Sequence, residues 1–288
     1  MSPNLAGALL MMASMACFTI NDTFLKLTAE TVPLFQMLFL RSLITCGLIG
    51  GTRGHLGPLH FRVARRDWGI IALRAVSEVM IAYFFLQALV NMPIANITAI
   101  MQVVPLVVTL ASALVLREAV GWRRMVAIAV GLIGVLLIVK PGAEGFNVWS
   151  LYALIAVLGV TVRDLVTRKL SPEVPSMTVT LVTAATVMAA AFFASLSAPW
   201  VAIGGREALL IFGSAVFIMG GYFFSIAVMR SGDVSFTAPF RYTGLVWALV
   251  LGWFVFGEWP GLLTLIGAGI VAATGMFTFY RERKLSQG

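Results

Sequence analysis

Charged residues are scarce in this sequence, in which they make up 11% of 288 residues, and cysteine and histidine occur only twice each. A soluble domain carries roughly a quarter charged residues. Here 60% of the residues are apolar, and the mean hydropathy is +0.98. The composition therefore excludes a soluble protein and indicates a membrane protein.

The few cysteines and histidines also argue against metal chemistry. Cys17 and Cys46 lack metal-ligand spacing and lie inside apolar runs, where a structural disulfide is not expected. We interpret His55 and His60 as solvated residues of one basic loop. The apolar runs contain no histidine, zinc-protease motif or Ser–His arrangement, and the chain has no phosphate-binding P-loop. We therefore expect no metal, no cofactor and no enzymatic activity.

The apolar residues form ten long runs. A bilayer core about 30 Å thick requires about 20 apolar residues per helix, and continuous rather than alternating runs exclude a β-barrel. The first run lacks a basic leader and a small-residue cleavage site, so we expect a retained helix rather than a signal peptide. The expected fold is an all-α polytopic membrane protein with helices at 4–25, 33–51, 67–90, 94–116, 122–140, 148–166, 176–198, 208–229, 234–256 and 260–280.

The net charge of +8 is distributed unevenly along the chain. If the N-terminus is cytoplasmic, thirteen of the twenty basic residues fall in loops or tails on that side. Basic residues favour the cytoplasmic side of a membrane. We therefore expect both termini to be cytoplasmic in a bacterial inner membrane, and we attribute the excess charge to topology rather than to a nucleic-acid partner.

The chain contains an internal repeat. The stretch from Tyr83-Phe84-Phe85 to Arg117-Glu118 recurs from Tyr222-Phe223-Phe224 to Gly257-Glu258, shifted by 139 residues at its start and 140 at its end. Five spans separate equivalent helices, and because five is odd the second copy must run antiparallel to the first. Such inverted repeats are typical of secondary transporters. We expect five-helix units at 1–142 and 143–288.

Two charged residues inside the expected spans, Glu78 and Arg241, reach similar depths near the middle of the bilayer. The repeat shift of 139 places Arg241 opposite Gln102. Thr98 and Thr237 lie four residues earlier, on the same helix faces. Because transporters bind substrate near the midplane, these five residues are candidates for a substrate site.

Helix-breaking residues lie close to these polar faces. Pro105, Pro239 and Gly244 interrupt the fourth and ninth spans, which can free backbone carbonyls to line a cavity. The alternative is a buried ion pair between Glu78 and Arg241 that only locks helices together. We favour a site, because two buried ions are a costly way to fasten helices. If Glu78 carries protons, Glu78→Gln should change the pH dependence of transport.

Three tyrosines inside the spans are further candidates for the substrate site, because a hydroxyl in hydrocarbon needs a partner. Tyr83, Tyr222 and Tyr242, together with an arginine and a glutamate, would suit a planar or zwitterionic solute.

Other intramembrane charges are candidates for gating or coupling. Asp22 and Arg41 are candidates for an ion pair across the first two helices, and Asp164 is the repeat counterpart of Asp22. Arg163 adjoins Asp164 and can neutralise it locally. The residues leave packing, gating and coupling open as roles for these groups.

Acids and glycines near the helix ends have structural interpretations. Glu118 and Glu258 precede the fifth and tenth helices, where an acid favours a helix N-terminus. Small residues allow close helix packing, internally or across a homodimer. The glycines concerned are a GxxxG spacing in 47–51 and Gly131, Gly134, Gly267 and Gly269.

Several of these motifs resemble the EamA-type members of the drug/metabolite transporter superfamily over nearly the whole chain. The matching segments are Leu116-Arg117-Glu118, Phe256-Gly257-Glu258, the glycine-rich fifth and tenth helices, Asn21-Asp22 with Lys26, Arg41, and Ala238-Pro239-Phe240-Arg241-Tyr242. The resemblance implies ten helices, cytoplasmic termini and no nucleotide-driven motor. Within the superfamily, the Asn-Asp-x-x-x-Lys and Pro-Phe-Arg-Tyr combination is similar to a proteobacterial group of riboflavin transporters, S-adenosylmethionine importers and metabolite exporters, and most similar to its riboflavin branch.

The expected function is secondary transport of a small organic metabolite by alternating access, with riboflavin uptake as the leading substrate hypothesis. Export of amino acids or related metabolites is an alternative. A channel would require a continuous polar stripe or a ring of like charges, and the sequence has neither. The expected partners are a small-molecule substrate, membrane lipid and, through the glycine faces, a second copy of the chain.

Overall fold

The computed structural model describes residues 3–51, 61–115, 121–139, 147–167, 169–171, 173–231 and 237–286. These residues form helices and turns, with no strand among them. In chain order the helices are α1 (Pro3–Thr28), α2 (Leu34–Gly51), α4 (Arg65–Asn91), α5 (Ile94–Met101), α6 (Val104–Val115), α7 (Trp122–Val139), α8 (Val148–Thr167), α9 (Ser176–Ser195), α10 (Gly205–Ser231), the 3₁₀ helix η1 (Ala238–Tyr242), α12 (Thr243–Phe256) and α13 (Leu262–Ser286).

Each of the ten expected spans is helical over its described residues, with ends that differ by a few residues from the expected bounds. Eight segments are long and apolar enough to cross a membrane, and two shorter apolar helices cover Met125–Val139 and Leu262–Thr278. The expectation of an all-helical, multi-pass membrane protein is confirmed. The apolar runs become helices because a helix satisfies its own backbone hydrogen bonds in lipid.

The fourth and ninth spans are each broken into two pieces. The fourth changes from α5 to α6 at Gln102 and Val103, and the ninth begins as η1 and continues as α12. Pro105 lies in the first turn of α6, and Pro239 in the first turn of η1. Proline is tolerated in a first turn but not in a helix interior, so the helix restarts at each site. The predicted interruptions are confirmed.

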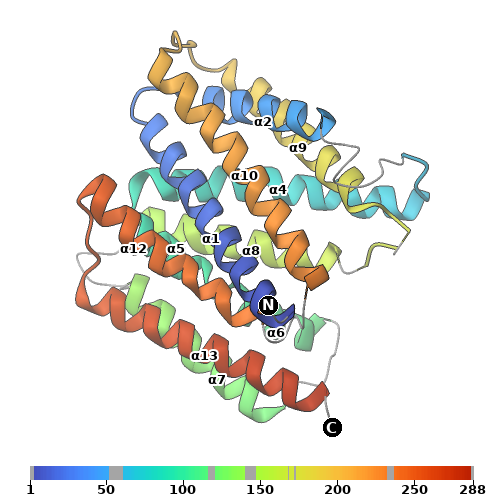
Figure 1. Cartoon of the computed structure of the whole chain (residues 1–288), viewed down its shortest axis with the longest axis vertical. Coiled ribbons are helices and arrows are strands. Elements are labelled where there is room, and N and C mark those ends of the chain that lie inside the picture. The colour runs from blue at the N-terminus through green and yellow to red at the C-terminus, as the bar shows by residue number, and fades with distance from the viewer. Residues whose placement is uncertain are drawn as a thin grey trace.

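The most extensive helix contacts join the two halves of the chain. Helix α1 packs along α10, α4 along α8, α2 along α9, and α7 along α13 (Figure 1). The first helix of each half thus packs against the third helix of the other half. The second and fifth helices pack against the equivalent helices of the other half. This pattern fits two copies related by a pseudo-two-fold axis, and it places every major interface between the copies.

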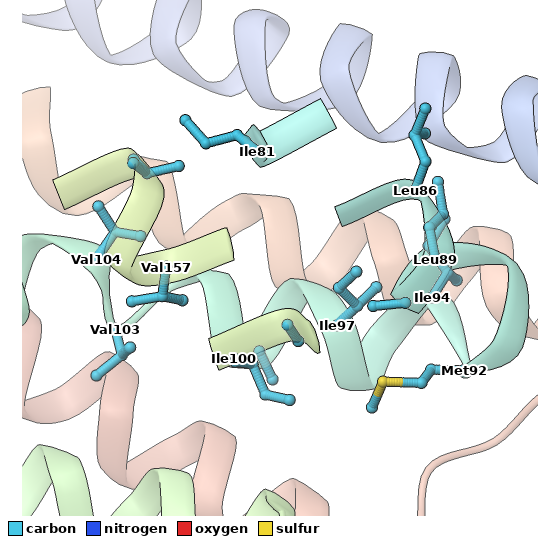
Figure 2. Close-up of a cluster of buried hydrophobic side chains, with 14 of the residues drawn as sticks. Ile81, Leu86, Leu89, Met92, Ile94, Ile97, Ile100, Val103, Val104 and Val157 are labelled. Atoms are coloured by element: carbon cyan, nitrogen blue, oxygen red, sulfur yellow. The ribbon is translucent and has the colours of Figure 1, made fainter. Parts of the chain in front are cut away.

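Helix α5 contributes to the cluster of buried apolar side chains. Ile94, Ile97 and Ile100 are fully buried there, against Leu89 of α4 and Val157 of α8 (Figure 2). The close packing of these branched side chains fixes α5 in the middle of the bundle. It therefore also fixes the position of Gln102, the residue that follows α5.

Glycines hold α7 and α13 at close range. A Cβ atom added at Gly134 would lie 2.9 Å from the carbonyl oxygen of Gly267, and one added at Gly131 would lie 2.8 Å from Thr274 Oγ1. By contrast, Gly47 and Gly269 have no atom within 4 Å of such a Cβ. Internal packing therefore explains Gly131, Gly134 and Gly267, and the other two glycines face outward.

Candidate functional site

A cavity of about 240 Å³ lies between α2, α4, α9 and α10. Helices α2 and α4 come from the first half of the chain, and α9 and α10 come from the second, so both halves form its walls. Its polar lining consists of Arg41, Ser42, Thr45, Arg74, Glu78, Thr180, Thr183, Tyr222 and Ser225. Of the sequence candidates, Arg41, Glu78 and Tyr222 are in this set.

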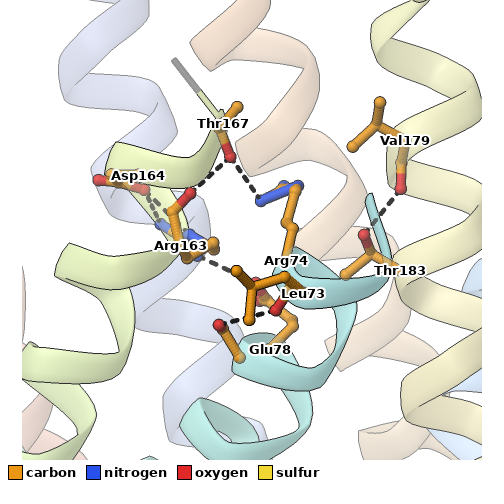
Figure 3. A network of polar contacts seen from close by, with 9 residues as sticks. Leu73, Arg74, Glu78, Arg163, Asp164, Thr167, Val179 and Thr183 are labelled. Atoms are coloured by element: carbon orange, nitrogen blue, oxygen red, sulfur yellow. Dashed lines mark hydrogen bonds and ion pairs between the residues drawn. The ribbon is translucent and has the colours of Figure 1, made fainter. Parts of the chain in front are cut away.

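Glu78 belongs to a network of charges beside the cavity (Figure 3). Arg163 Nη1 on α8 lies 3.3 Å from Glu78 Oε2, and Arg163 Nη2 lies 2.9 Å from Asp164 Oδ1. The interpretation that Arg163 neutralises Asp164 is confirmed. The alternative of an ion pair between Glu78 and Arg241 is wrong, because α4 packs along α8 and Arg163 is therefore the partner of Glu78.

Two further arginines line the cavity with few partners. Arg74 Nη1 donates to Thr167 Oγ1 over 3.5 Å, and Thr167 Oγ1 donates to the Arg163 carbonyl oxygen over 2.6 Å (Figure 3). The Nε atoms of Arg74 and Arg41 are buried, and neither has a hydrogen-bond partner. Both guanidinium groups thus keep unused donors at the cavity wall.

The possible pair between Asp22 and Arg41 is not formed. Among the described residues, neither side chain belongs to an ion pair shorter than 4 Å. Asp22 Oδ1 instead accepts from Asn21 Nδ2 over 2.9 Å, and Asn21 Oδ1 accepts from Ser214 Oγ over 2.8 Å. The Asn21 amide therefore connects Asp22 to α10, and Arg41 lines the cavity instead.

Gln102 and Arg241, the residues matched by the repeat, contact each other. Gln102 Nε2 donates to the carbonyl oxygen of Arg241 over 2.9 Å, and their separation of 139 residues equals the repeat shift. The contact therefore joins equivalent positions where the two broken spans cross, which we term the crossing. Thr98 lies one turn before Gln102, and Thr237 is fully buried against Gly7 of α1. None of these residues lines the cavity.

Replacing Gln102 with leucine tests the crossing. The substitution removes a hydrogen bond between broken spans, and such bonds in membrane proteins contribute about 0.6 kcal/mol on average and up to about 1.7 kcal/mol. We expect Gln102→Leu to lower the stability in detergent by about 1 kcal/mol, measured by thermal unfolding. Asn91→Ala is the matched control, because it removes an exposed side-chain bond to the Gln87 carbonyl. Equal effects of the two substitutions would contradict a role of the crossing in stability.

The three candidate tyrosines have different environments. Tyr222 lines the cavity with 40% of its surface exposed and packs edge-on against Phe18 at 5.6 Å. Tyr83 stacks on Phe35 at 6.0 Å, in an aromatic cluster away from the cavity lining. Tyr242 is buried against α13, and its hydroxyl has no hydrogen-bond partner. Only Tyr222 of these three is placed to contact a solute in the cavity.

A second polar group, which we term the latch, joins three segments distant in sequence. Lys26 Nζ lies 2.7 Å from Glu258 Oε1 and donates to the Met92 carbonyl oxygen over 2.6 Å. Glu258 Oε2 accepts from the Ile94 N–H over 3.1 Å, and the Lys26 ammonium lies 4.9 Å from the Phe256 ring centroid. Glu258 thus caps α5 in the other half, whereas the sequence suggested the N-terminus of the tenth helix.

The latch and the cavity lie in opposite halves of the bundle. Lys26 is near the end of α1, and Ile94 begins α5 at the same end. In the cavity, Arg74 lies about 14 Å along α4 from the start of that helix, and Thr183 lies about 10 Å along α9 from its start. Both starts are at the opposite end from the latch, so the ion pair lies at the end away from the cavity.

The remaining residues singled out in the sequence are the histidines, the cysteines and Glu118. Glu118, His55 and His60 lie outside the described residues. Cys17 and Cys46 are free thiols. Within the described ranges, no group of three or more His, Cys, Asp or Glu side chains is placed to bind a metal ion.

Comparison with known proteins identifies the family. The EamA-like transporter family matches the chain twice, over residues 5–140 and 147–280. The chain belongs to the EamA-like transporter family. The two matches each cover five of the ten spans, and they agree with the two sets of helices that share the cavity.

Similar proteins differ in the substrates that their names give. An S-adenosylmethionine uptake transporter of Rickettsia conorii is 31% identical over 194 residues, which cover 67% of this chain and 65% of that protein, just under two thirds of its length. A riboflavin transporter of Vibrio cholerae is 32% identical over 225 residues, covering 76% of this chain and 74% of that protein. A protein of known crystal structure shares the fold with a TM-score of 0.68 and 19% identity, covering 97% of this chain and 98% of the other.

Proposed function

We propose that this EamA-family transporter is a secondary carrier that moves a small organic metabolite across the bacterial inner membrane by alternating access, with both termini cytoplasmic. The cavity carries this proposal, because its walls come from both halves of the chain and hold charged and hydroxyl groups inside an apolar bundle. Movement of one half against the other would open such a cavity to alternate sides.

The latch supports the alternating-access mechanism. It joins α1, the start of α5 and the end of α12 at the end opposite the cavity. A carrier must hold one end closed while the other is open, and the alternative conformation must break this closure. We infer that separation of Lys26 from Glu258 accompanies opening of that end.

Two substrate classes have specific support. Arg41 and Arg74 on the cavity wall favour a charged metabolite that bears an anionic group, such as S-adenosylmethionine, the solute named for the Rickettsia relative. Tyr222 and Phe223 on the same wall favour a planar solute, and the Vibrio relative is named for riboflavin. We place the charged metabolite first, because an arginine in an apolar interior requires a polar partner. Riboflavin uptake is the second candidate.

A transport assay tests the proposed function. The purified full chain, reconstituted in liposomes preloaded with unlabelled solute, is expected to exchange labelled S-adenosylmethionine or labelled riboflavin without nucleotide. Rescue of a riboflavin auxotroph on low external riboflavin tests the second candidate in cells. Large single-channel currents in planar bilayers would contradict a carrier and indicate a channel, because carriers turn over far too slowly to give them.

A further inference from the structure

We propose that the cavity binds the carboxylate group of its substrate, held by Arg41 and Arg74, so that the transported solutes are organic acids of the amino-acid type. The inference rests on the proposed function and specifies the substrate class of the same site. It follows from the juxtaposition of two guanidinium groups from α2 and α4 on one cavity wall.

Arg41 lacks a protein counter-charge within ion-pair distance. No described carboxylate lies within 4 Å of its guanidinium, and its Nε is buried without a hydrogen-bond partner. The Arg74 Nε is in the same state, and this side chain has only a long bond to Thr167. An arginine is always charged in a protein, and a charge inside the membrane is costly unless it is paired or hydrated. An anionic ligand would supply the missing partner.

The acids near the cavity are already engaged. Glu78 lines the cavity but lies 3.3 Å from Arg163, and Asp164 lies 2.9 Å from the same arginine. Asp22 accepts from the neighbouring Asn21 amide. None of these three acids lies within 4 Å of the Arg41 guanidinium. Arg41 and Arg74 therefore keep guanidinium donors without a protein acceptor beside the cavity.

The number of charges favours a group with a single negative charge. The cavity lining itself contains two arginines and one carboxylate, Arg41 and Arg74 against Glu78, which leaves an excess of one positive charge. A carboxylate carries one negative charge and matches the planar guanidinium fork in a bidentate arrangement. A phosphate monoester would bring close to two charges at neutral pH. The excess of one thus favours a carboxylate over a phosphate monoester.

The rest of the cavity suits an organic body attached to such a carboxylate. Thr45 and Thr183 offer hydroxyl groups, while Val187 and Ile218 offer apolar surface. Tyr222 presents a partly exposed ring. A solute with one carboxylate, a few polar atoms and an apolar or aromatic portion would use all of these walls.

Matched solutes test the inference on the unmodified protein. In the liposome exchange assay the probes are S-adenosylmethionine, decarboxylated S-adenosylmethionine, the twenty L-amino acids, the amides of any that are transported, and riboflavin. We expect exchange of at least one carboxylate-bearing probe. The matched probe in which the carboxylate is absent or is an amide, which we term the partner probe, should have an apparent KM roughly 10- to 100-fold higher, because charge-assisted hydrogen bonds are lost.

Substitutions assign the effect to the two arginines. Arg41→Gln and Arg74→Gln should raise the KM of the carboxylate probe by a similar factor and leave that of the partner probe unchanged, and Arg41→Lys should give an intermediate value. Arg206→Gln, at an exposed arginine of α10, is the matched control. The comparison of probes on the unmodified protein decides the inference even if an arginine variant fails to fold.

The outcomes separate this inference from the proposed function. Exchange of riboflavin but of no carboxylate probe would overturn the inference and uphold the carrier. Equal exchange of a carboxylate probe and its partner, or equal effects of Arg41→Gln on both, would also overturn it. Exchange of none of the probes by correctly inserted protein would contradict both proposals.

Discussion

Glu258→Gln is expected to destabilise the protein by about 3 kcal/mol, the largest loss that we expect from removal of one charge. The substitution leaves Lys26, whose side chain is 10% exposed, without its counter-charge. Breaking a buried ion pair by removing one partner costs about 3–5 kcal/mol, and the partial exposure of Glu258 favours the lower end. A loss of this size would lower the thermal midpoint by roughly 6–12 °C, measured by unfolding of the purified protein in detergent.

Two further variants test whether the loss of stability comes from leaving a buried charge unpaired. Lys26→Met combined with Glu258→Gln leaves no charge at the latch and should recover more than half of the lost stability, because an unpaired buried charge costs more than an apolar replacement. Arg206→Gln removes one partner of a pair 4.0 Å apart whose side chains are 58% and 56% exposed, and should change stability by less than about 1 kcal/mol. Equal losses for Glu258→Gln and Arg206→Gln would show that the latch is not a buried ion pair.

The same double variant tests whether the latch controls access to one end of the carrier. If the latch closes one end of the carrier, a cysteine at position 92, next to the latch, should react with a membrane-impermeant maleimide once the latch is removed. Met92 is 5% exposed with the latch intact. The background needs Cys17→Ser and Cys46→Ser, because both native thiols are free. Unchanged labelling in the stable double variant would limit Lys26 and Glu258 to a structural role.

The helices could be predicted from the sequence because lipid leaves the backbone few alternatives. A continuous apolar run must satisfy its N–H and C=O groups internally, so hydropathy alone locates helices such as α4 and α8. Pro105 and Pro239 locate the breaks in the same way, because a proline ring is incompatible with a helix interior. The contact between Gln102 and Arg241 could be anticipated as well, because equivalent residues close to a two-fold axis must approach each other.

The partners of the charges could not be predicted in this way. Counting residues gives the depth of Glu78 in the membrane, but depth does not say which neighbouring helix its side chain faces. The packing of α4 along α8 decides in favour of Arg163, and Arg241 lies instead at the crossing. The latch was missed for the same reason, since 232 residues separate Lys26 from Glu258. The family motifs contain both residues, but no pattern within either segment connects them.

The intramembrane polar residues therefore form two groups, those that join helices and those that line the cavity. The ion pair of Lys26 with Glu258 and the bond from Gln102 hold segments of the two halves together. Around the cavity, by contrast, arginines exceed their partners. Polar groups that fasten helices are satisfied by the protein itself, whereas groups that bind a transient solute must keep capacity free. At the cavity, the buried Nε atoms of Arg41 and Arg74 have no hydrogen-bond partner.

Gly267→Leu is expected to be the most disruptive apolar substitution, because α7 and α13 are in contact at their backbones. A Cβ at Gly267 would collide with the Gly134 carbonyl oxygen and lie 2.8 Å from Ile138 Cγ1. Backbone atoms cannot move aside as a flexible side chain can, so the helices must separate. Overpacking costs about 1–3 kcal/mol where side chains can adjust, and we expect at least the upper end here, with a thermal midpoint lower by roughly 6–12 °C.

Gly269→Leu separates this effect from the general consequences of adding a leucine. Both residues lie in α13, so the gain in helix propensity is the same. A Cβ at Gly269 meets no atom within 4 Å, and its midpoint should therefore stay close to that of the unmodified protein. Equal loss for both variants would contradict the packing of α7 on α13 as the cause. A change of oligomeric state with Gly269→Leu alone would instead indicate that the outward glycine face of α13 contacts a second copy of the chain, since small residues allow membrane helices to approach closely.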